Sequence, residues 1–238
     1  PPHDISGKDI KHYLPHEGPE ALMLLKLMEK AQAILAAHPV NQVRLDLGDH
    51  PANAIWLWGQ GIRPNLPLFK ELYGVNGAII SAVDLINGIG LLAGLTVISV
   101  PGATGYYDTN YKGKADYALQ ALKHHDFVFI HIEAPDEAGH NGDLKEKIAA
   151  IEAIDKDVLG TILNYFDPRD DVRILVVPDH PTPVKRQTHT REPVPFLIYG
   201  KGISANGQTA YNERSAEDSH VVFADGQTLM ERFINKYA

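Results

Sequence analysis

FVFIHIEAPDEAGH, residues 127–140, is the stretch that decides the fold of this chain. Its first six residues form a short run of mostly apolar, β-branched and aromatic side chains, which is typical of a buried strand. The eight residues that follow include three carboxylates and a histidine. In open α/β sheets, binding sites form beyond the carboxyl ends of the strands. The stretch therefore predicts a buried strand that leads directly into a candidate site.

The rest of the chain alternates between helix-like and strand-like segments. We expect helices over residues 19–37, 83–93, 114–124, 144–166 and 226–237, and strands over residues 54–58, 78–81, 95–100, 127–132, 172–177 and 194–199. Helix 144–166 has the clearest pattern, because its apolar residues step by three or four and Asp143 precedes it as a cap. The alternation predicts an α/β fold, a three-layer sandwich with a mostly parallel sheet covered on both faces.

The composition is that of an ordinary globular protein without an obvious attraction to polyanions. With 44% hydrophobic and 22% charged residues, the 238-residue chain has enough apolar side chains to bury a core. A formal net charge of -8 disfavours nucleic acid and anionic lipid as partners, and no apolar run approaches the roughly 20 residues of a membrane span. The absence of cysteine excludes disulfides and thiolate metal sites and fits a reducing compartment, so we expect a cytoplasmic location.

Side chains that bind metals gather at three places beside the predicted strands. Asp136 and His140 follow strand 127–132, Asp179 and His180 follow strand 172–177, and His189 lies shortly before strand 194–199. Carboxylate oxygen and imidazole nitrogen together suit zinc, manganese or cobalt. Each of the first two clusters has a plain structural alternative, an aspartate that caps a turn beside a packed or exposed histidine, and His189 by itself carries little weight. Three clusters at one edge of one sheet favour a metal site.

The spacing of Asp136 and His140 supports this interpretation. The two residues are four apart, so one helical turn would place both side chains on the same face. Gly139, immediately before His140, would let the backbone turn there without a steric clash.

These elements resemble a known family. IEAPDEAGH at residues 132–140 resembles the Ala-Pro-Asp-x-x-Gly-His element of the cofactor-independent phosphoglycerate mutases of the alkaline phosphatase superfamily. VPDH at residues 177–180 resembles the family's Asp-His pair, and THT at 188–190 with PVPF at 193–196 resembles its His-Thr and Pro-Val-Pro-Phe element. Their order, their spacing and the helix between them agree with the family.

Two further phrases point to one branch of that family. WLWGQG at residues 56–61 and PGATG at residues 101–105 are similar to the archaeal-type branch, some bacterial members of which are described as homoserine kinases. The resemblance extends over most of the chain and is most specific for residues 126–200.

The resemblance implies a phosphotransferase with two divalent metal ions, which manganese, zinc, cobalt or magnesium would supply. One ion would be held by Asp136, His140 and His189, and the other by Asp179 and His180. In this family a serine takes the phosphoryl group from one carbon of the glycerate and returns it to another, interconverting 3-phosphoglycerate and 2-phosphoglycerate. A phosphoglycerate or a similar small phosphorylated metabolite is the expected partner. For substrate binding the resemblance suggests Lys114, with Arg44 and Arg63 as further candidates.

The sequence also departs from the family. The family's N-terminal strand with its Asp-Gly ligand and its nucleophilic serine have no counterpart here, so we expect no catalytic serine in this chain and no mutase turnover by the chain alone. We expect residues 1–50 to be a remnant of the family's inserted substrate-binding domain and residues 51–238 to be the C-terminal part of an incomplete metal-binding core. Two alternatives stay open: a related phosphatase or homoserine kinase-like phosphotransferase, and a fragment that only binds metal. The absence of a P-loop favours the mutase over the kinase.

Overall fold

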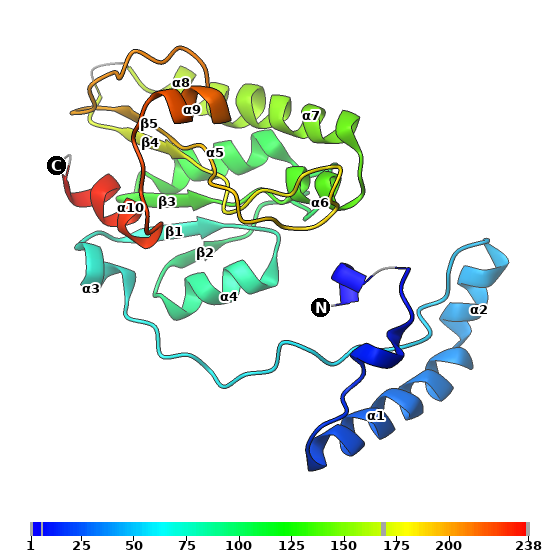
Figure 1. Ribbon diagram of the computed structural model, residues 1–238. Helices are drawn as coiled ribbons and strands as arrows, with labels where there is room; N and C mark the ends of the chain where they lie inside the picture. Colours follow the sequence, from blue (N-terminus) through cyan, green and yellow to red (C-terminus); the bar gives the residue numbers. More distant parts are fainter. Residues whose placement is uncertain (1, 6, 168–169, 237–238) are drawn as a thin grey trace. The chain divides into compact units, whose positions relative to one another are not determined.

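The computed structural model describes residues 2–5, 7–167 and 170–236 (Figure 1). The chain divides into two compact units, one ending at Arg63 and one beginning at Pro64. The assignment of residues 1–50 to an inserted substrate-binding domain stays a prediction. Among the described residues no helix is both long and apolar enough to cross a membrane.

The first unit consists of helical elements joined by irregular chain. These are η1 (Pro2–Ile5), η2 (Ile10–Tyr13), α1 (Pro19–Ala36) and α2 (Pro39–Asp46). Helix α1 confirms the prediction, but α2 was not predicted. Pro39 does not only stop α1. It also begins α2, where a proline fits because the first helical N–H has no partner, and the ring nitrogen Nδ1 of His38 accepts a hydrogen bond from the Val40 N–H at 3.2 Å.

The strand predicted over residues 54–58 is wrong. Residues 51–68 carry neither helix nor strand, and no described part of the first unit offers a strand with which the segment could pair. The side chain of Asn41 instead anchors the start of the segment. It donates to the Ala52 carbonyl at 2.9 Å and accepts from the Ala52 N–H at 2.8 Å.

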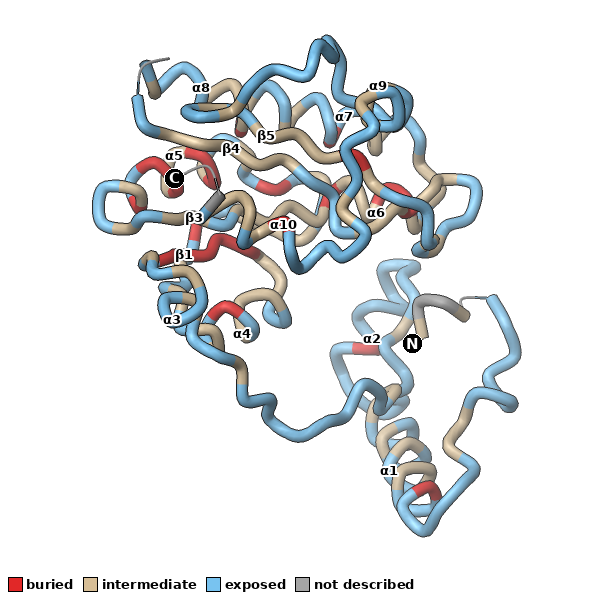
Figure 2. Tube along the Cα trace, turned by 60° about the vertical axis from the view of Figure 1, so that its left-hand side comes forward, coloured by how far each residue is buried: buried red, intermediate tan, exposed pale blue. Residues whose placement is uncertain are grey.

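A parallel three-stranded sheet forms the centre of the second unit. Its strands are β1 (Gly77–Ile80), β2 (Thr96–Ile98) and β3 (Phe127–Ile130), in the order β2-β1-β3. Helices α4 (Asp84–Leu92) and α5 (Tyr111–Ala121) connect them. Every residue of β1 is buried, as its red tube in Figure 2 shows. The predicted α/β alternation is confirmed, and the carboxyl ends of β1 and β3 lie side by side.

Two further strands form a separate antiparallel pair. β4 (Arg173–Val176) pairs with β5 (Leu197–Gly200), and Arg173 lies opposite Gly200. The predicted parallel arrangement holds for β1 to β3 and not for β5. A parallel neighbour requires a crossover, usually a helix. Residues 177–196 contain no helix, so the chain returns along β4 in the opposite direction.

The remaining helices are α3 (Phe69–Tyr73), α6 (Ala134–His140), α7 (Leu144–Ala153), η3 (Ile154–Leu159), α8 (Gly160–Tyr165), α9 (Glu213–Asp218), α10 (Gln227–Glu231) and η4 (Arg232–Lys236). The predicted helix 144–166 is present as the run α7–η3–α8, in which η3 is a π-helical turn. Asp143 caps α7 as predicted, because its side chain accepts from the Glu146 N–H at 3.0 Å. The predicted helix 226–237 corresponds to α10 and η4, and Tyr237 lies outside the described residues.

Ile80, the last residue of β1, is fully buried against Val100 and Ala118. We expect Ile80→Ala to lower the free energy of unfolding by about 2–5 kcal/mol and Ile80→Val by about 0.5–1.5 kcal/mol, because the first change leaves the larger cavity. Denaturant unfolding would measure both. Leu91→Ala, at a side chain that is 69% exposed, is the matched control and should cost much less. Equal losses at Ile80 and Leu91 would contradict this assignment of the core.

Candidate metal centre

Helix α6 places the first two predicted ligands. Pro135 lies in the first turn of the helix, Asp136 follows it, and His140 is the last helical residue. The Nε2 atom of His140 lies 3.2 Å from an oxygen of Asp136, one turn away on the same face. The two side chains are neighbours, as their spacing predicts.

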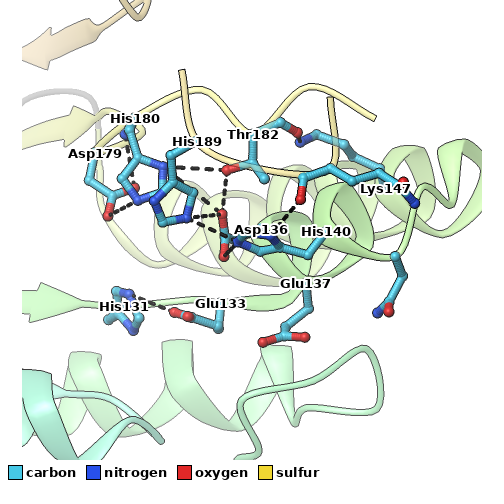
Figure 3. A network of polar contacts seen from close by, with 12 residues as sticks. His131, Glu133, Asp136, Glu137, His140, Lys147, Asp179, His180, Thr182 and His189 are labelled. Carbon is cyan, nitrogen blue, oxygen red and sulfur yellow. Dashed lines mark hydrogen bonds and ion pairs between the residues drawn. The ribbon is translucent and has the colours of Figure 1, made fainter. Parts of the chain in front are cut away.

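The irregular segment between β4 and β5 brings two histidines to the same carboxylate. His189 Nε2 lies 3.4 Å from Asp136 Oδ1 and 3.0 Å from His140 Nε2. The ring of His180 lies against that of His189, tilted by 31° with 3.7 Å between ring centroids, and its Nδ1 lies 4.0 Å from Asp136 Oδ1. Figure 3 shows the three rings around the carboxylate.

The fifth predicted ligand lies at the outer side of this cluster. Asp179 approaches His180 with 3.3 Å between its Oδ2 and the ring Nε2. The five side chains that the sequence predicts as metal ligands are therefore gathered at one place, although they come from two separate segments in which His140 and His189 are 49 positions apart.

The donor set suits a divalent cation. Asp136, His180 and His189 each offer one ligand atom, and these atoms all lie within 4.8 Å of one another. Nitrogen and carboxylate oxygen are the ligands of zinc, manganese and cobalt sites. Two imidazole nitrogens only 3.0 Å apart also need a proton or a cation between their lone pairs.

A second polar group lies next to these ligands and was not predicted from the sequence. Ser81 follows β1 and His131 follows β3, and the Ser81 hydroxyl lies 3.0 Å from His131 Nδ1. The other ring nitrogen of His131 lies 3.1 Å from the Glu133 carboxylate. Burial, followed by the charges of Asp136 and Glu137, raises the pKa of Glu133. Burial, followed by the charge of Lys114, lowers the pKa of His131.

Lys114, the predicted substrate contact, is a buried side chain of α5. It is only 1% exposed, and its ammonium group donates to the His131 carbonyl at 2.9 Å. Burial lowers the pKa of Lys114 to about 8, although the charge of Glu133 acts in the opposite direction. The lysine therefore lies beneath the end of β3, and its contact with substrate stays a prediction.

Thr182 connects α6, α7 and the segment that carries the histidines. Its hydroxyl donates to Asp136 Oδ1, and its carbonyl accepts from the Lys147 ammonium at 2.6 Å. Gly139 makes this approach possible, because a Cβ at that position would overlap the Thr182 carbonyl oxygen. Sequence reasoning missed Thr182 and Lys147. The one signal available in the sequence was Gly139. This glycine permits the close contact with Thr182 and is not needed for a backbone turn.

Comparisons with known proteins identify the superfamily of the chain. Residues 22–232 match the model of the metalloenzyme superfamily, and residues 1–41 match that of the 2,3-bisphosphoglycerate-independent phosphoglycerate mutases. The chain belongs to the metalloenzyme superfamily. Within it, the chain is similar to cofactor-independent phosphoglycerate mutases, which confirms the resemblance that its motifs predicted.

Two curated relatives illustrate the similarity. The chain is 50% identical over 237 residues to a probable 2,3-bisphosphoglycerate-independent phosphoglycerate mutase of Geobacter sulfurreducens, covering 99% of this chain and 59% of that protein. It is 54% identical over 232 residues to the enzyme so named in Methanosarcina acetivorans, covering 97% of this chain and 58% of that protein. The chain thus spans about three-fifths of the length of these relatives.

Two solved structures share the fold. A Pyrococcus horikoshii protein matches with a TM-score of 0.71 and 35% identity, over 87% of this chain and 54% of that one. The cofactor-independent phosphoglycerate mutase of Thermoplasma acidophilum matches with a TM-score of 0.57 and 25% identity, over 92% of this chain and 52% of that one.

Replacing Gly139 tests the close contact between α6 and Thr182. We expect Gly139→Ala to leave the chain folded, because alanine favours a helix, but to weaken Mn²⁺ binding by about tenfold or more. The added methyl group would push the segment with His180 and His189 away from Asp136. Calorimetric titration with Mn²⁺ would measure the effect. Gly88→Ala in α4 is the control, because a Cβ there meets nothing within 4 Å. Equal Mn²⁺ affinity of both variants would contradict the role of Gly139.

The depressed pKa of Lys114 predicts a pH-dependent stability. Because the folded-state pKa, about 8, is below the ordinary 10.5, the unfolded chain binds more protons between these values. The folded state therefore gains stability as the pH rises from about 8 to about 10.5, and the full penalty of the buried charge is present below that window. Relative to Lys114→Met, the free energy of unfolding of the parent chain should rise by up to about 3 kcal/mol between pH values of about 8 and about 10.5. Denaturant unfolding at several pH values would measure the difference. Lys123→Met, at an exposed residue, should follow the parent curve. A Lys114→Met curve parallel to that of the parent would show that no buried charge titrates.

Proposed function

We propose that this chain is the metal-binding part of a phosphoglycerate mutase that interconverts 3-phosphoglycerate and 2-phosphoglycerate. The observation that carries the proposal is the convergence of Asp136, His140 and His189 beside Asp179 and His180. The names of the curated relatives supply the substrate.

In this proposal the chain holds two divalent ions, with manganese as the first candidate. Asp136, His140 and His189 hold one, and Asp179 and His180 contribute to the other. Bound ions of this kind supply Lewis-acid stabilisation of the phosphoryl charge and activation of a hydroxyl nucleophile.

The chain's own residues prepare that site. Asp136 places one negative charge among three imidazole rings, which keeps the rings together. His131 orients the Glu133 carboxylate through a ring that Ser81 holds at its other nitrogen. The charge of Lys114 lies beneath the end of β3, where it offsets Glu133, and we propose that it also favours an anionic substrate.

We place the nucleophilic serine in the part of the mutase fold that lies beyond the region matched here. The relatives are considerably longer than this chain. Among the serines of the chain, Ser81 is the one that lies in the described polar group beside the ligands. Its hydroxyl is buried and engaged by His131 and by the Val83 N–H, so it is not offered to a substrate.

The cytoplasmic location also stays a prediction.

A chimaera tests the mutase function. This chain would be joined to the part of the Geobacter sulfurreducens relative that it does not match, and conversion of 3-phosphoglycerate to 2-phosphoglycerate would be followed with added Mn²⁺. We expect turnover that disappears when a chelator removes the metal. It should also disappear with Asp136→Ala, because this change removes the carboxylate that contacts all three histidines. Asp116→Asn, at a carboxylate paired with Lys112 on α5, should keep the activity.

The same chimaera separates the alternatives. A folded, Mn²⁺-bound chimaera that hydrolyses a simple phosphate ester or phosphorylates homoserine, but does not interconvert phosphoglycerates, would overturn the mutase proposal in favour of a related phosphotransferase.

A further inference from the structure

We propose that Thr182 is a positioning residue that fixes the ring tautomer of His180 and thereby links the two metal sites. The inference rests on the metal ligands of the proposed function. It concerns a residue outside that ligand set, and Figure 3 shows dashed lines from its hydroxyl to both Asp136 and His180.

The Thr182 hydroxyl has a single hydrogen atom and two polar neighbours. The side chain is buried, with 4% of the residue exposed, so no bulk water replaces a missing partner. Its oxygen contacts Asp136 Oδ1 and also lies 3.3 Å from His180 Nδ1. An ionised carboxylate accepts hydrogen bonds and donates none, so the single hydroxyl hydrogen is directed at Asp136.

The direction of the Thr182 hydroxyl determines which nitrogen of His180 carries the hydrogen. Because the hydroxyl hydrogen is already used, the contact between Thr182 and His180 is a hydrogen bond only if Nδ1 carries the hydrogen and donates it. In the neutral ring Nε2 then has a free lone pair. That lone pair faces Asp179 Oδ2 across 3.3 Å. Two electron-pair donors at this distance form a ligand pair for a cation, and a histidine ligand commonly donates its other N–H to a neighbouring group.

Thr182 is itself held in place by its neighbours. Its carbonyl oxygen accepts from Lys147 of α7 at 2.6 Å, and it packs against the space left by Gly139 of α6. Thr182 is therefore held against both helices. The hydroxyl transmits this fixed position to Asp136, a predicted ligand of one ion, and to His180, a predicted ligand of the other.

The substitutions Thr182→Val and Thr182→Ser test the hydroxyl directly. Valine keeps the shape and removes the hydroxyl, so we expect about 10- to 100-fold weaker Mn²⁺ binding in a titration of the 238-residue chain. Serine keeps the hydroxyl and should restore most of the affinity. Thr161→Val is the matched control, because the Thr161 hydroxyl bonds to the Asp157 carbonyl within its own helical run and should leave Mn²⁺ binding unchanged.

The tautomer provides a readout that a merely structural role would not move. In ¹H–¹⁵N spectra of the histidine side chains, with Zn²⁺ bound and without metal, we expect the Nδ1–H form of His180 in the parent chain and in Thr182→Ser. In the metal-free spectra Thr182→Val should show a larger share of the Nε2–H form, because the oxygen that accepts the Nδ1–H is lost. A folded Thr182→Ser variant that binds Mn²⁺ as weakly as Thr182→Val would overturn the inference.

The outcomes also distinguish this inference from the proposed function. Tight Mn²⁺ binding by the parent chain and by Thr182→Val, with the same His180 tautomer, would overturn the inference and leave the metal site standing. The chain could also bind neither Mn²⁺ nor Zn²⁺ and still show a His180 Nδ1–H tautomer that depends on Thr182. That result would support the hydrogen bond between Thr182 and His180, but it would overturn both the proposed metal function and the link between two metal sites.

Discussion

The Asp136 carboxylate is the group on which the candidate site depends, because it contacts the rings of His140, His180 and His189. Its negative charge favours any cation, proton or metal, that the rings share, which offsets the cost of bringing three imidazoles together. Its position has two sources. Helix α6 sets it one turn from His140, and the contact of Gly139 with Thr182 brings the other two rings to it.

The parts of the fold and site that the sequence predicts are those with local causes. Asp136 and His140 are neighbours because the residues lie one helical turn apart, and Asp143 caps α7 because its side chain reaches an N–H three residues on. Thr182 has no comparable pattern. Its hydroxyl bonds to a residue 46 positions away, as Ser81 bonds to a histidine 50 positions away. Such contacts exist only after the helices and strands have packed.

The errors have the same origin. Residues 54–58 have a strand-like composition, but a strand also needs a partner, and the described part of the first unit provides none. Pro39 ends one helix by the usual rule and begins another, so one residue carries two opposite signals. The direction of β5 depends on the absence of a helix between residues 177 and 196, and not on the apolar run that forms the strand itself.

Two groups of side chains in the site are built from the same kinds of residue. Each joins a buried hydroxyl to Nδ1 of a histidine whose Nε2 faces a carboxylate: Ser81–His131–Glu133 and Thr182–His180–Asp179. Ser81 accepts the Val83 N–H at 3.0 Å, and its own hydrogen is available to His131 Nδ1. If it donates there, the Nε2–H of the neutral His131 ring satisfies Glu133 without a cation. Thr182 gives its hydrogen to Asp136, which leaves His180 Nε2 bare toward Asp179. The direction of the Thr182 hydroxyl hydrogen thus distinguishes a pair of groups that can bind a cation from a closed chain of hydrogen bonds.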